Sequence, residues 1–153
     1  MCGIIGYNGS AKNAKEAIIA GLKNLEYRGY DSAGIALVEN KKVDLYKSQG
    51  KISKLEDSLK DINTNSNIGI GHTRWATHGI PNEINAHPHK VGKVTLVHNG
   101  IIENYAILKN EMISKGVTFK TQTDSEVACA YINYMYEKEL ENNSKTPELT
   151  AII

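Results

Sequence analysis

A cysteine at position 2 is the residue of this chain whose chemistry depends most on its place in the sequence. Its small size favours removal of Met1, after which Cys2 carries a thiol and a free α-amino group. The ordinary pKa of the amine is about 7.7–8.0 and that of a thiol about 8.5, so the amine can accept the thiol proton near neutral pH. One residue then supplies nucleophile and base, as in N-terminal threonine systems. A structural cysteine, at a position that accepts any small residue, is the alternative.

Two groups of polar residues directly follow predicted strands, where site residues are often presented. Arg74, within residues 72–79, can bind a carboxylate through two N–H donors, or form a surface ion pair without function. Asn99 and Gly100 place a side-chain amide beside a bare backbone N–H, and such a pair can form an oxyanion hole. An ordinary Asn-Gly turn explains the same two residues.

Further charged residues allow two interpretations each. Asp124 begins a predicted helix and can pair with a substrate ammonium. For the residue taken alone, stabilisation of the helix N-terminus by its charge is the favoured interpretation. Arg28 and Asp31 lie in a polar loop, where they either orient the N-terminal strand or belong to a plain turn.

The five histidines all lie between residues 72 and 98, which raises the alternative of a zinc site. No helical His-x-x-x-His pair occurs, Glu83 is the one carboxylate nearby, and no cysteine pair is close. Clustered ligands without a recognised spacing are weak evidence, so a metal site is disfavoured. The histidines are His72, His78, His87, His89 and His98.

Composition narrows the class of protein. A chain of 153 residues can bury the core of one domain. Its 18 basic and 17 acidic residues give a net charge of +1, which gives no reason to expect nucleic acid or a membrane surface as a partner. No stretch is long and apolar enough to span a bilayer, and the N-terminus lacks a secretory signal. Cys2 and Cys129 fit a reducing compartment, so we expect the cytoplasm.

The elements that must position these residues are strands interleaved with helices. One strand pair is joined by the turn 39–42, and residues 123–126 have the form of a capping box. Cys129 lies on the helix after this box and is expected to be a buried structural thiol. The pattern indicates an α+β layered fold. Strands are predicted at 2–8, 33–38, 43–46, 68–73 and 94–98, and helices at 11–26, 52–59, 102–115 and 125–139.

The C-terminal residues have the form of a helix that starts and then stops. Thr146 resembles an N-cap, Pro147 an N1 residue and Glu148 an acidic first turn. The chain then ends on the apolar run 149–153 without a capping glycine. We therefore expect that it stops short of the natural end of its domain. A naturally short helix packed on the core is the alternative.

Taken together and in this order, the motifs resemble class II, N-terminal-nucleophile glutamine amidotransferases. Within that group they are similar to the glutaminase part of the glutamine–fructose-6-phosphate aminotransferases, and residues 72–79 and 85–89 favour these over other members. The matching segments are MCGIIG (1–6), LEYRGYDSAG (25–34), HTRWATHG (72–79), NAHPH (85–89), VHNGIIEN (97–104) and TDSE (123–126).

The resemblance implies a role for each motif. Cys2 attacks the side-chain amide of L-glutamine, and its α-amino group acts as base and then as proton donor. Arg74 holds the α-carboxylate of the substrate and Asp124 its α-ammonium. The remaining implied roles are oxyanion stabilisation by Asn99 and the Gly100 N–H, pocket lining by Thr77, His78 and Gly100, a place towards the ammonia exit for Trp75, and positioning by Arg28 and Asp31.

The resemblance also implies a fold and a reaction. The fold is a four-layer αββα sandwich of the N-terminal-nucleophile hydrolase type, with residues 1–153 as an N-terminal part that is incomplete at its C-terminus. The reaction releases glutamate and ammonia through a Cys2 thioester, without a metal or cofactor. Fructose 6-phosphate accepts the ammonia through isomerase domains that this chain lacks, in a full-length enzyme expected to be a homo-oligomer. A non-catalytic truncated fragment and the glutaminase part of another class II amidotransferase are the alternatives.

Overall fold

The computed structural model describes residues 2–76 and 79–142, and the chain divides into two compact units. The first unit comprises residues 1–88 and 97–100, and the second comprises residues 89–96 and 101–153. The short segment 97–100 therefore returns to the first unit after the chain has entered the second. None of the helices within the described ranges is long and apolar enough to cross a membrane.

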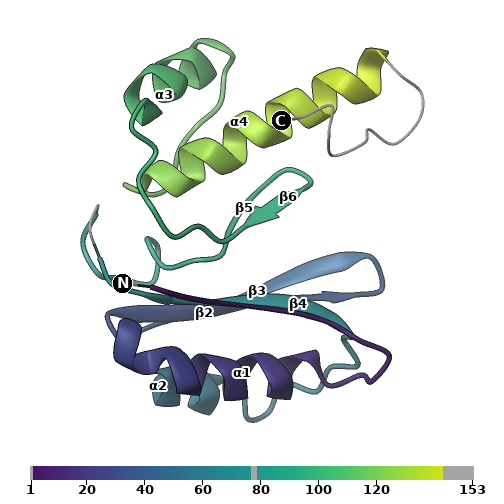
Figure 1. Ribbon diagram of the computed structural model, residues 1–153. Coiled ribbons are helices and arrows are strands. Elements are labelled where there is room, and N and C mark those ends of the chain that lie inside the picture. Colours follow the sequence, from purple (N-terminus) through teal and green to yellow (C-terminus); the bar gives the residue numbers. More distant parts are fainter. Residues whose placement is uncertain (1, 77–78, 143–153) are drawn as a thin grey trace. The chain divides into compact units, whose positions relative to one another are not determined.

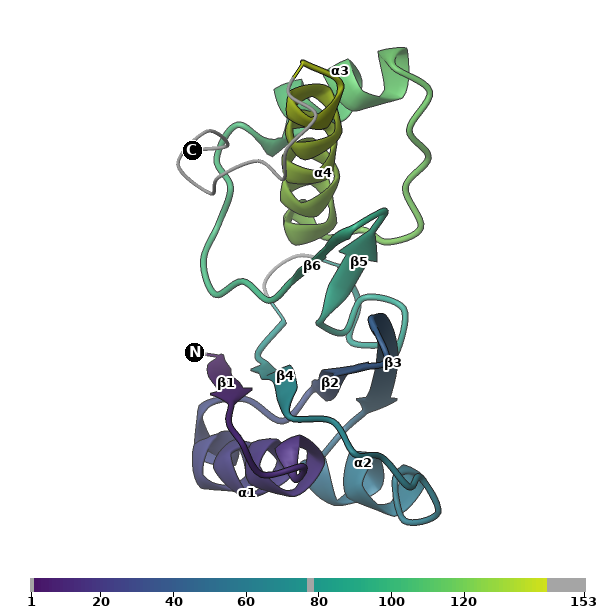
Figure 2. The same ribbon diagram turned by 90° about the vertical axis from the view of Figure 1, so that its right-hand side faces the viewer.

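The first unit is a four-stranded antiparallel sheet with two helices on one face (Figure 1, Figure 2). The strand order is β1-β4-β2-β3, so the N-terminal strand lies at one edge and pairs with β4. A single turn of 3-10 helix, Glu26–Arg28, follows α1. The elements are β1 (Gly3–Asn8), α1 (Ala14–Leu25), β2 (Ser32–Glu39), β3 (Lys42–Gln49), α2 (Ile52–Ser58) and β4 (Ile68–Arg74).

The core of this unit lies between the sheet and its helices. Ile18 and Leu22, four residues apart on α1, are fully buried against the sheet with Ile35 of β2. Gly71 of β4 lies directly under α1, where a side chain would collide with Ile18. The missing side chain thus lets the helix lie close to β4, the strand that ends at Arg74.

The hairpin β2–β3 turns through Asn40 and Lys41, whose φ angles are 51° and 63°. Two successive residues with positive φ are typical of the two-residue turns whose twist matches that of the flanking strands. The predicted turn at 39–42 is therefore confirmed, and Glu39 and Lys42 pair as the last residues of their strands.

The second unit contains a short hairpin and two helices (Figure 1). Its elements are β5 (His89–Val91), β6 (Val94–Leu96), α3 (Tyr105–Ser114) and α4 (Asp124–Asn142). Helix α4 packs against both the hairpin and α3. Cys129 of α4 is fully buried, and burial raises the pKa of its thiol to about 11, which confirms the predicted structural thiol.

The start of α4 is capped by a variant of the predicted capping box. The Thr123 hydroxyl accepts the Glu126 N–H at 3.3 Å, as the box requires. The Glu126 carboxylate accepts the N–H groups of Thr121 and Lys120, at 2.7 and 3.0 Å, whereas the usual box returns to the cap residue itself. The charge on Glu126 thus holds the segment before the helix as well as its first turn.

The predicted elements are confirmed, with shifts at their ends. The helix predicted at 11–26 begins at Ala14, and the one predicted at 102–115 begins at Tyr105. Strand β5 was not predicted. The helix predicted from Thr146 lies outside the described residues.

Candidate functional site

The Cys2 side chain is held by the backbone that follows strand β4. The Trp75 N–H donates to Cys2 Sγ at 3.2 Å, and the thiol lies 3.6 Å from the Trp75 carbonyl, to which it donates. The next residue, Gly3, pairs with Thr73 and donates its N–H to the Thr73 hydroxyl at 3.0 Å. The antiparallel register of β1 and β4 therefore sets the position of the nucleophile predicted from the sequence.

Asn99 reaches the same residue from the far end of the first unit's sequence. Its side-chain amide donates to the Cys2 carbonyl at 3.1 Å. Gly100 is the next residue and has no side chain. A Cβ at this position would lie 3.0 Å from His98 Nε2. Of the two residues predicted to form an oxyanion hole, Asn99 thus contacts the main chain of Cys2, and Gly100 is its neighbour in the sequence.

Asp31 and Gly29 fix the segment that contacts the thiol. The Asp31 carboxylate accepts the Ala76 N–H at 2.8 Å, and the Asp31 N–H donates to the Arg74 carbonyl at 3.1 Å. A side chain at Gly29 would come within 2.7 Å of the Arg74 carbonyl carbon, so the loop approaches this segment as closely as only glycine allows. The contacts of Asp31 hold residues 74–76, whereas its place in a polar loop had suggested either orientation of the N-terminal strand or a plain turn.

Arg74 ends strand β4 and is 4% exposed. Its guanidinium donates to the carbonyls of Gly79 and Ile80, each at 3.3 Å. Arg28 lies at the end of the 3-10 turn, with its guanidinium 5.9 Å from the ring centre of Tyr27, a cation–π distance. The buried guanidinium of Arg74 is of a kind suited to a carboxylate ligand.

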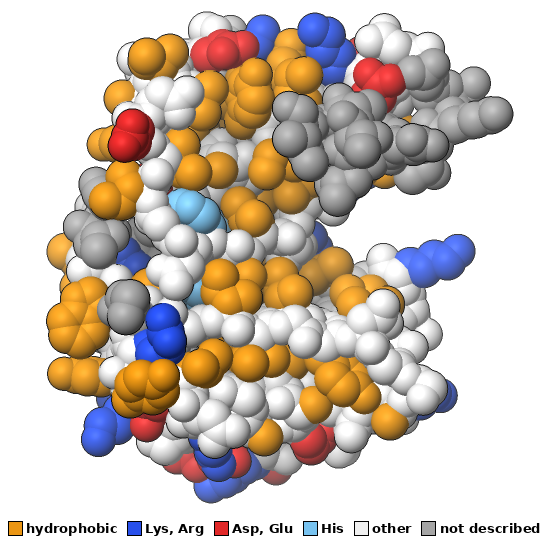
Figure 3. All heavy atoms as spheres, viewed as in Figure 1, with side chains coloured by type: hydrophobic (Ala, Val, Ile, Leu, Met, Phe, Trp, Pro, Cys, Tyr) orange, Lys and Arg blue, Asp and Glu red, His pale blue; other side chains and the backbone are white. Residues whose placement is uncertain are grey.

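Trp75 contacts Cys2 through its backbone, while its side chain lies at the surface. Figure 3 shows hydrophobic side chains on the surface of the first unit. Among the exposed ones are Trp75 and Tyr30, whose rings meet edge to face with centroids 6.0 Å apart.

Three histidines form a network in the first unit that was not predicted from the sequence; His72 and His87 are buried, and His98 is half-buried. His72 Nε2 lies 3.1 Å from the His98 carbonyl, and the His98 N–H donates to His87 Nδ1 at 3.2 Å. The rings of His72 and His87 stack with centroids 4.2 Å apart. Burial lowers the pKa of His72 to about 4, so its ring is neutral at physiological pH. The signal in the sequence was their position, since His72 lies within a predicted strand and His98 at the end of another.

Asp124 belongs to the second unit, at the first residue of α4. One carboxylate oxygen accepts the Ile102 N–H at 2.8 Å and the other accepts the Ser125 hydroxyl at 3.3 Å. The bond to Ile102 joins the start of α4 to the segment before α3, and the carboxylate charge is favourable at the helix N-terminus.

The structure does not describe two of the predicted site residues, and it bears on the alternative of a metal site. Thr77 and His78 lie outside the described residues. Within residues 2–76 and 79–142, no three His, Cys, Asp or Glu side chains are grouped so as to hold a metal ion.

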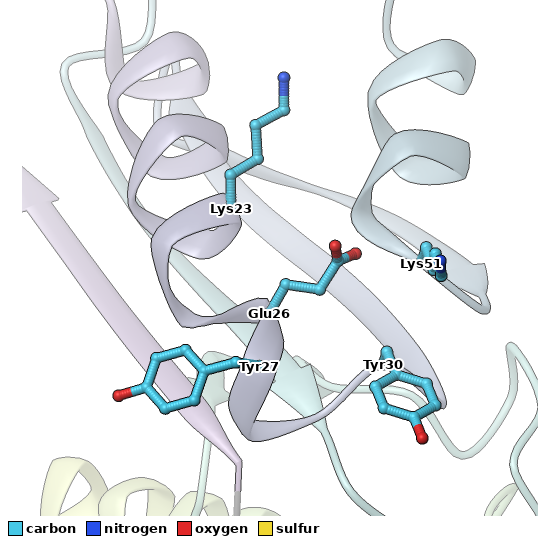
Figure 4. Close-up of a pocket in the computed structure, with 5 residues that line it drawn as sticks. All are labelled: Lys23, Glu26, Tyr27, Tyr30 and Lys51. Atoms are coloured by element: carbon cyan, nitrogen blue, oxygen red, sulfur yellow. The ribbon is translucent and has the colours of Figure 1, made fainter.

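A surface hollow of about 600 Å³ lies where α1, the 3-10 turn and α2 meet (Figure 4). Two of its charged groups bind neighbouring residues: Lys23 pairs with Glu56 of α2 at 2.7 Å, and the Glu26 carboxylate accepts the Ile52 N–H at 2.7 Å. These contacts tie the two helices together. The lining residues are Lys23, Glu26, Tyr27, Tyr30 and Lys51.

Comparison with known proteins gives a family and a set of relatives. A family model described as a glutamine amidotransferase domain matches residues 38–143. A glutamine–fructose-6-phosphate aminotransferase (isomerizing) of Thermococcus kodakarensis is 53% identical over 150 residues, which are 97% of this chain and 24% of the relative. The Pyrococcus horikoshii protein of the same name is 57% identical over 129 residues, or 83% of this chain and 21% of that protein. The chain thus spans about a quarter of the length of such relatives.

Solved structures show the same fold. The glutamine phosphoribosylpyrophosphate amidotransferase from B. subtilis, complexed with ADP and GMP, matches with a TM-score of 0.73 and 28% identity, over 87% of this chain and 29% of that chain. A structure described as the allosteric regulatory enzyme of purine biosynthesis matches with a TM-score of 0.73 and 26% identity, over 90% of this chain and 30% of that chain. These similarities confirm the predicted N-terminal-nucleophile hydrolase fold.

Proposed function

The chain belongs to the glutamine amidotransferase domain family, and from this premise we propose that it hydrolyses L-glutamine to glutamate and ammonia through a thioester on Cys2. The observation that carries the proposal is the convergence of two segments on Cys2. One is the end of β4 with Trp75, whose N–H donates to the sulfur, and the other is the segment of Asn99, whose amide donates to the carbonyl. Each segment holds a residue that the resemblance assigns to the reaction.

The first half of the reaction is acylation. With Met1 removed, the α-amine of Cys2 takes the thiol proton, and the sulfur attacks the side-chain amide carbon of glutamine. The oxygen of the tetrahedral intermediate gains a negative charge. Asn99 has two amide hydrogens, one of which donates to the Cys2 carbonyl, and we assign the other, with the Gly100 N–H, to this oxyanion.

The second half of the reaction releases ammonia and then regenerates the free enzyme by hydrolysis of the thioester. The α-ammonium gives its proton to the leaving nitrogen, the C–N bond breaks, and ammonia departs from a Cys2 thioester. Water then attacks the thioester carbon and releases glutamate with the thiol restored. We assign the substrate α-carboxylate to Arg74, a buried residue that directly precedes Trp75. We assign pocket lining to Thr77 and His78.

Two further assignments rest on the resemblance. Asp124 would hold the α-ammonium of the substrate, and Trp75 would lie towards the ammonia exit. In a protein of the relatives' length, we propose that fructose 6-phosphate, the sugar phosphate in the relatives' name, receives the ammonia within a homo-oligomer. We propose the cytoplasm as the compartment, since Cys2 and Cys129 are both free thiols.

An intact-mass measurement tests the glutaminase site. The chain is incubated with a glutamine-analogue diazoketone, alongside an untreated sample and the variants Cys2→Ala and Cys129→Ala. We expect loss of Met1 and one adduct on Cys2, absent from Cys2→Ala and retained in Cys129→Ala. Met1 loss without an adduct would refute a glutamine site formed by this chain.

A further inference from the structure

We propose that His72 and His87 are positioning residues for Asn99, which they hold by binding both backbone polar groups of the residue before it. His72 Nε2 lies 3.1 Å from the His98 carbonyl, and His87 Nδ1 accepts the His98 N–H at 3.2 Å. All four residues belong to the first unit. The inference rests on the proposed function, because it concerns the proposed oxyanion hole.

The two bonds fix the protonation of both rings. A carbonyl only accepts, so His72 Nε2 carries a hydrogen; a backbone N–H only donates, so His87 Nδ1 carries none. Each neutral ring then has its hydrogen on Nε2. The rings stack with an angle of 27° between their planes, and both residues are at most 4% exposed. A pair of neutral, stacked and buried rings is a rigid support.

The segment that carries Asn99 needs such a support. Residues 97–100 follow β6 but belong to no strand or helix, so no ladder of hydrogen bonds fixes their backbone. Side chains from β4 and from the segment before β5 bind the His98 backbone instead. The Asn99 amide in turn donates to the Cys2 carbonyl at 3.1 Å. The two histidines therefore bind His98, and its neighbour Asn99 binds Cys2, the nucleophile.

The contribution of an oxyanion donor to the rate depends on its position. A displacement of about 1 Å can reduce turnover by about a hundredfold, although the displaced group is still present. Release of the His98 backbone is therefore expected to lower kcat for glutamine hydrolysis and to leave KM nearly unchanged. Neither histidine contacts the substrate in this account.

Amide substitutions separate positioning from simple space filling. The amide of Gln lies where Nε2 of a histidine lies, and that of Asn lies where Nδ1 lies. At position 72 the required group is at Nε2, so His72→Gln should keep kcat within about threefold, and His72→Asn should lower it by about tenfold to a hundredfold. At position 87 the required group is at Nδ1, so the order reverses: His87→Asn should retain kcat and His87→Gln should lose it.

The steady-state kinetics of these four variants of the full chain test the proposal. Equal kcat for both amides at a position, or a higher kcat for Gln at both positions, would overturn it. Failure of both amide variants to fold at a position would also overturn it, since that result assigns the histidine to the stability of the sheet.

A second readout does not depend on turnover. The side-chain amide signals of Asn99 in ¹⁵N NMR spectra, and hydrogen exchange at the His98 amide, should match the unsubstituted chain in His72→Gln and His87→Asn. They should shift, and exchange should accelerate about tenfold or more, in the other two variants. Unchanged signals in all four variants would refute the positioning of Asn99 by His72 and His87. A chain that hydrolyses no glutamine would refute the proposed function alone, and these signals would still decide the role of the histidines.

Discussion

Acidification is expected to destabilise the first unit through the ring of His72. Burial is the main cause that lowers its pKa from the ordinary value of 6.5 to about 4, and the charge on Arg74 lowers it further. The hydrogen bond to the His98 carbonyl acts in the opposite direction and raises it. The net result is a ring that stays neutral when folded and takes up a proton when the chain unfolds.

The sign and size of the effect follow from linkage. Between about pH 4 and 6.5 the unfolded state binds more protons at this site, so the free energy of unfolding falls as the pH falls. The stability is fully present above pH 6.5 and is lost progressively down to about pH 4. One pH unit corresponds to about 1.4 kcal/mol, so His72 alone should remove about 2 kcal/mol by pH 5.

Urea unfolding at pH 7 and pH 5 measures this loss. Trp75 is the one tryptophan of the chain and lies in the first unit, so its fluorescence reports on that unit. His72→Gln keeps the donor to the His98 carbonyl but does not titrate. The unsubstituted chain should lose about 2 kcal/mol more than this variant between the two pH values, while carboxylates contribute equally to both. Equal losses would refute the assignment to His72.

Three further predictions use matched controls. Gly71→Ala should lower the free energy of unfolding by about 1–3 kcal/mol, because its methyl group meets α1, whereas Gly6→Ala meets nothing within 4 Å and should not; equal melting temperatures would contradict this. Thr73→Val should cost about 1–3 kcal/mol by leaving the first N–H of β1 unpaired, and Thr73→Ser should retain stability in the same urea assay. Iodoacetamide at pH 8 should spare Cys129, whose thiol has a pKa of about 11, until the chain is unfolded, and native labelling of Cys129 by mass spectrometry would contradict its burial.

The sequence predicted those parts of the fold that local pattern decides. Helix α1 and strands β2 and β4 show clear patterns of apolar residues, and the capping box at residues 123–126 predicts the start of α4. The shifted starts have tertiary causes. Asn13 does not cap α1, because its side-chain oxygen accepts the Tyr7 hydroxyl at 2.7 Å. Residues 102–104 stay outside α3 while the Ile102 N–H is bonded to Asp124. Strand β5 has three residues and one apolar side chain, too few for a period.

The contacts of the site depend on strand register, which a single sequence does not contain. Thr73 meets Gly3 because β1 and β4 are antiparallel in this register, and a shift by one residue would place its hydroxyl on the other face. The histidines illustrate the same limit. Their clustering raised a zinc site as a disfavoured alternative but gave no other role, whereas His72 and His87 bind the backbone of the segment that holds Asn99.

The nucleophile is supported mainly by backbone groups, and this determines which substitutions reach it. The Trp75 N–H donates to the Cys2 sulfur, and such a bond strengthens when the thiol becomes a thiolate. No change of the Trp75 side chain except one to proline removes that donor. Its position depends on Asp31, which holds the next N–H, that of Ala76, with a charged acceptor. A change at Asp31 is therefore expected to weaken the nucleophile more than a change of the tryptophan ring, although Asp31 lies further from the reacting atoms.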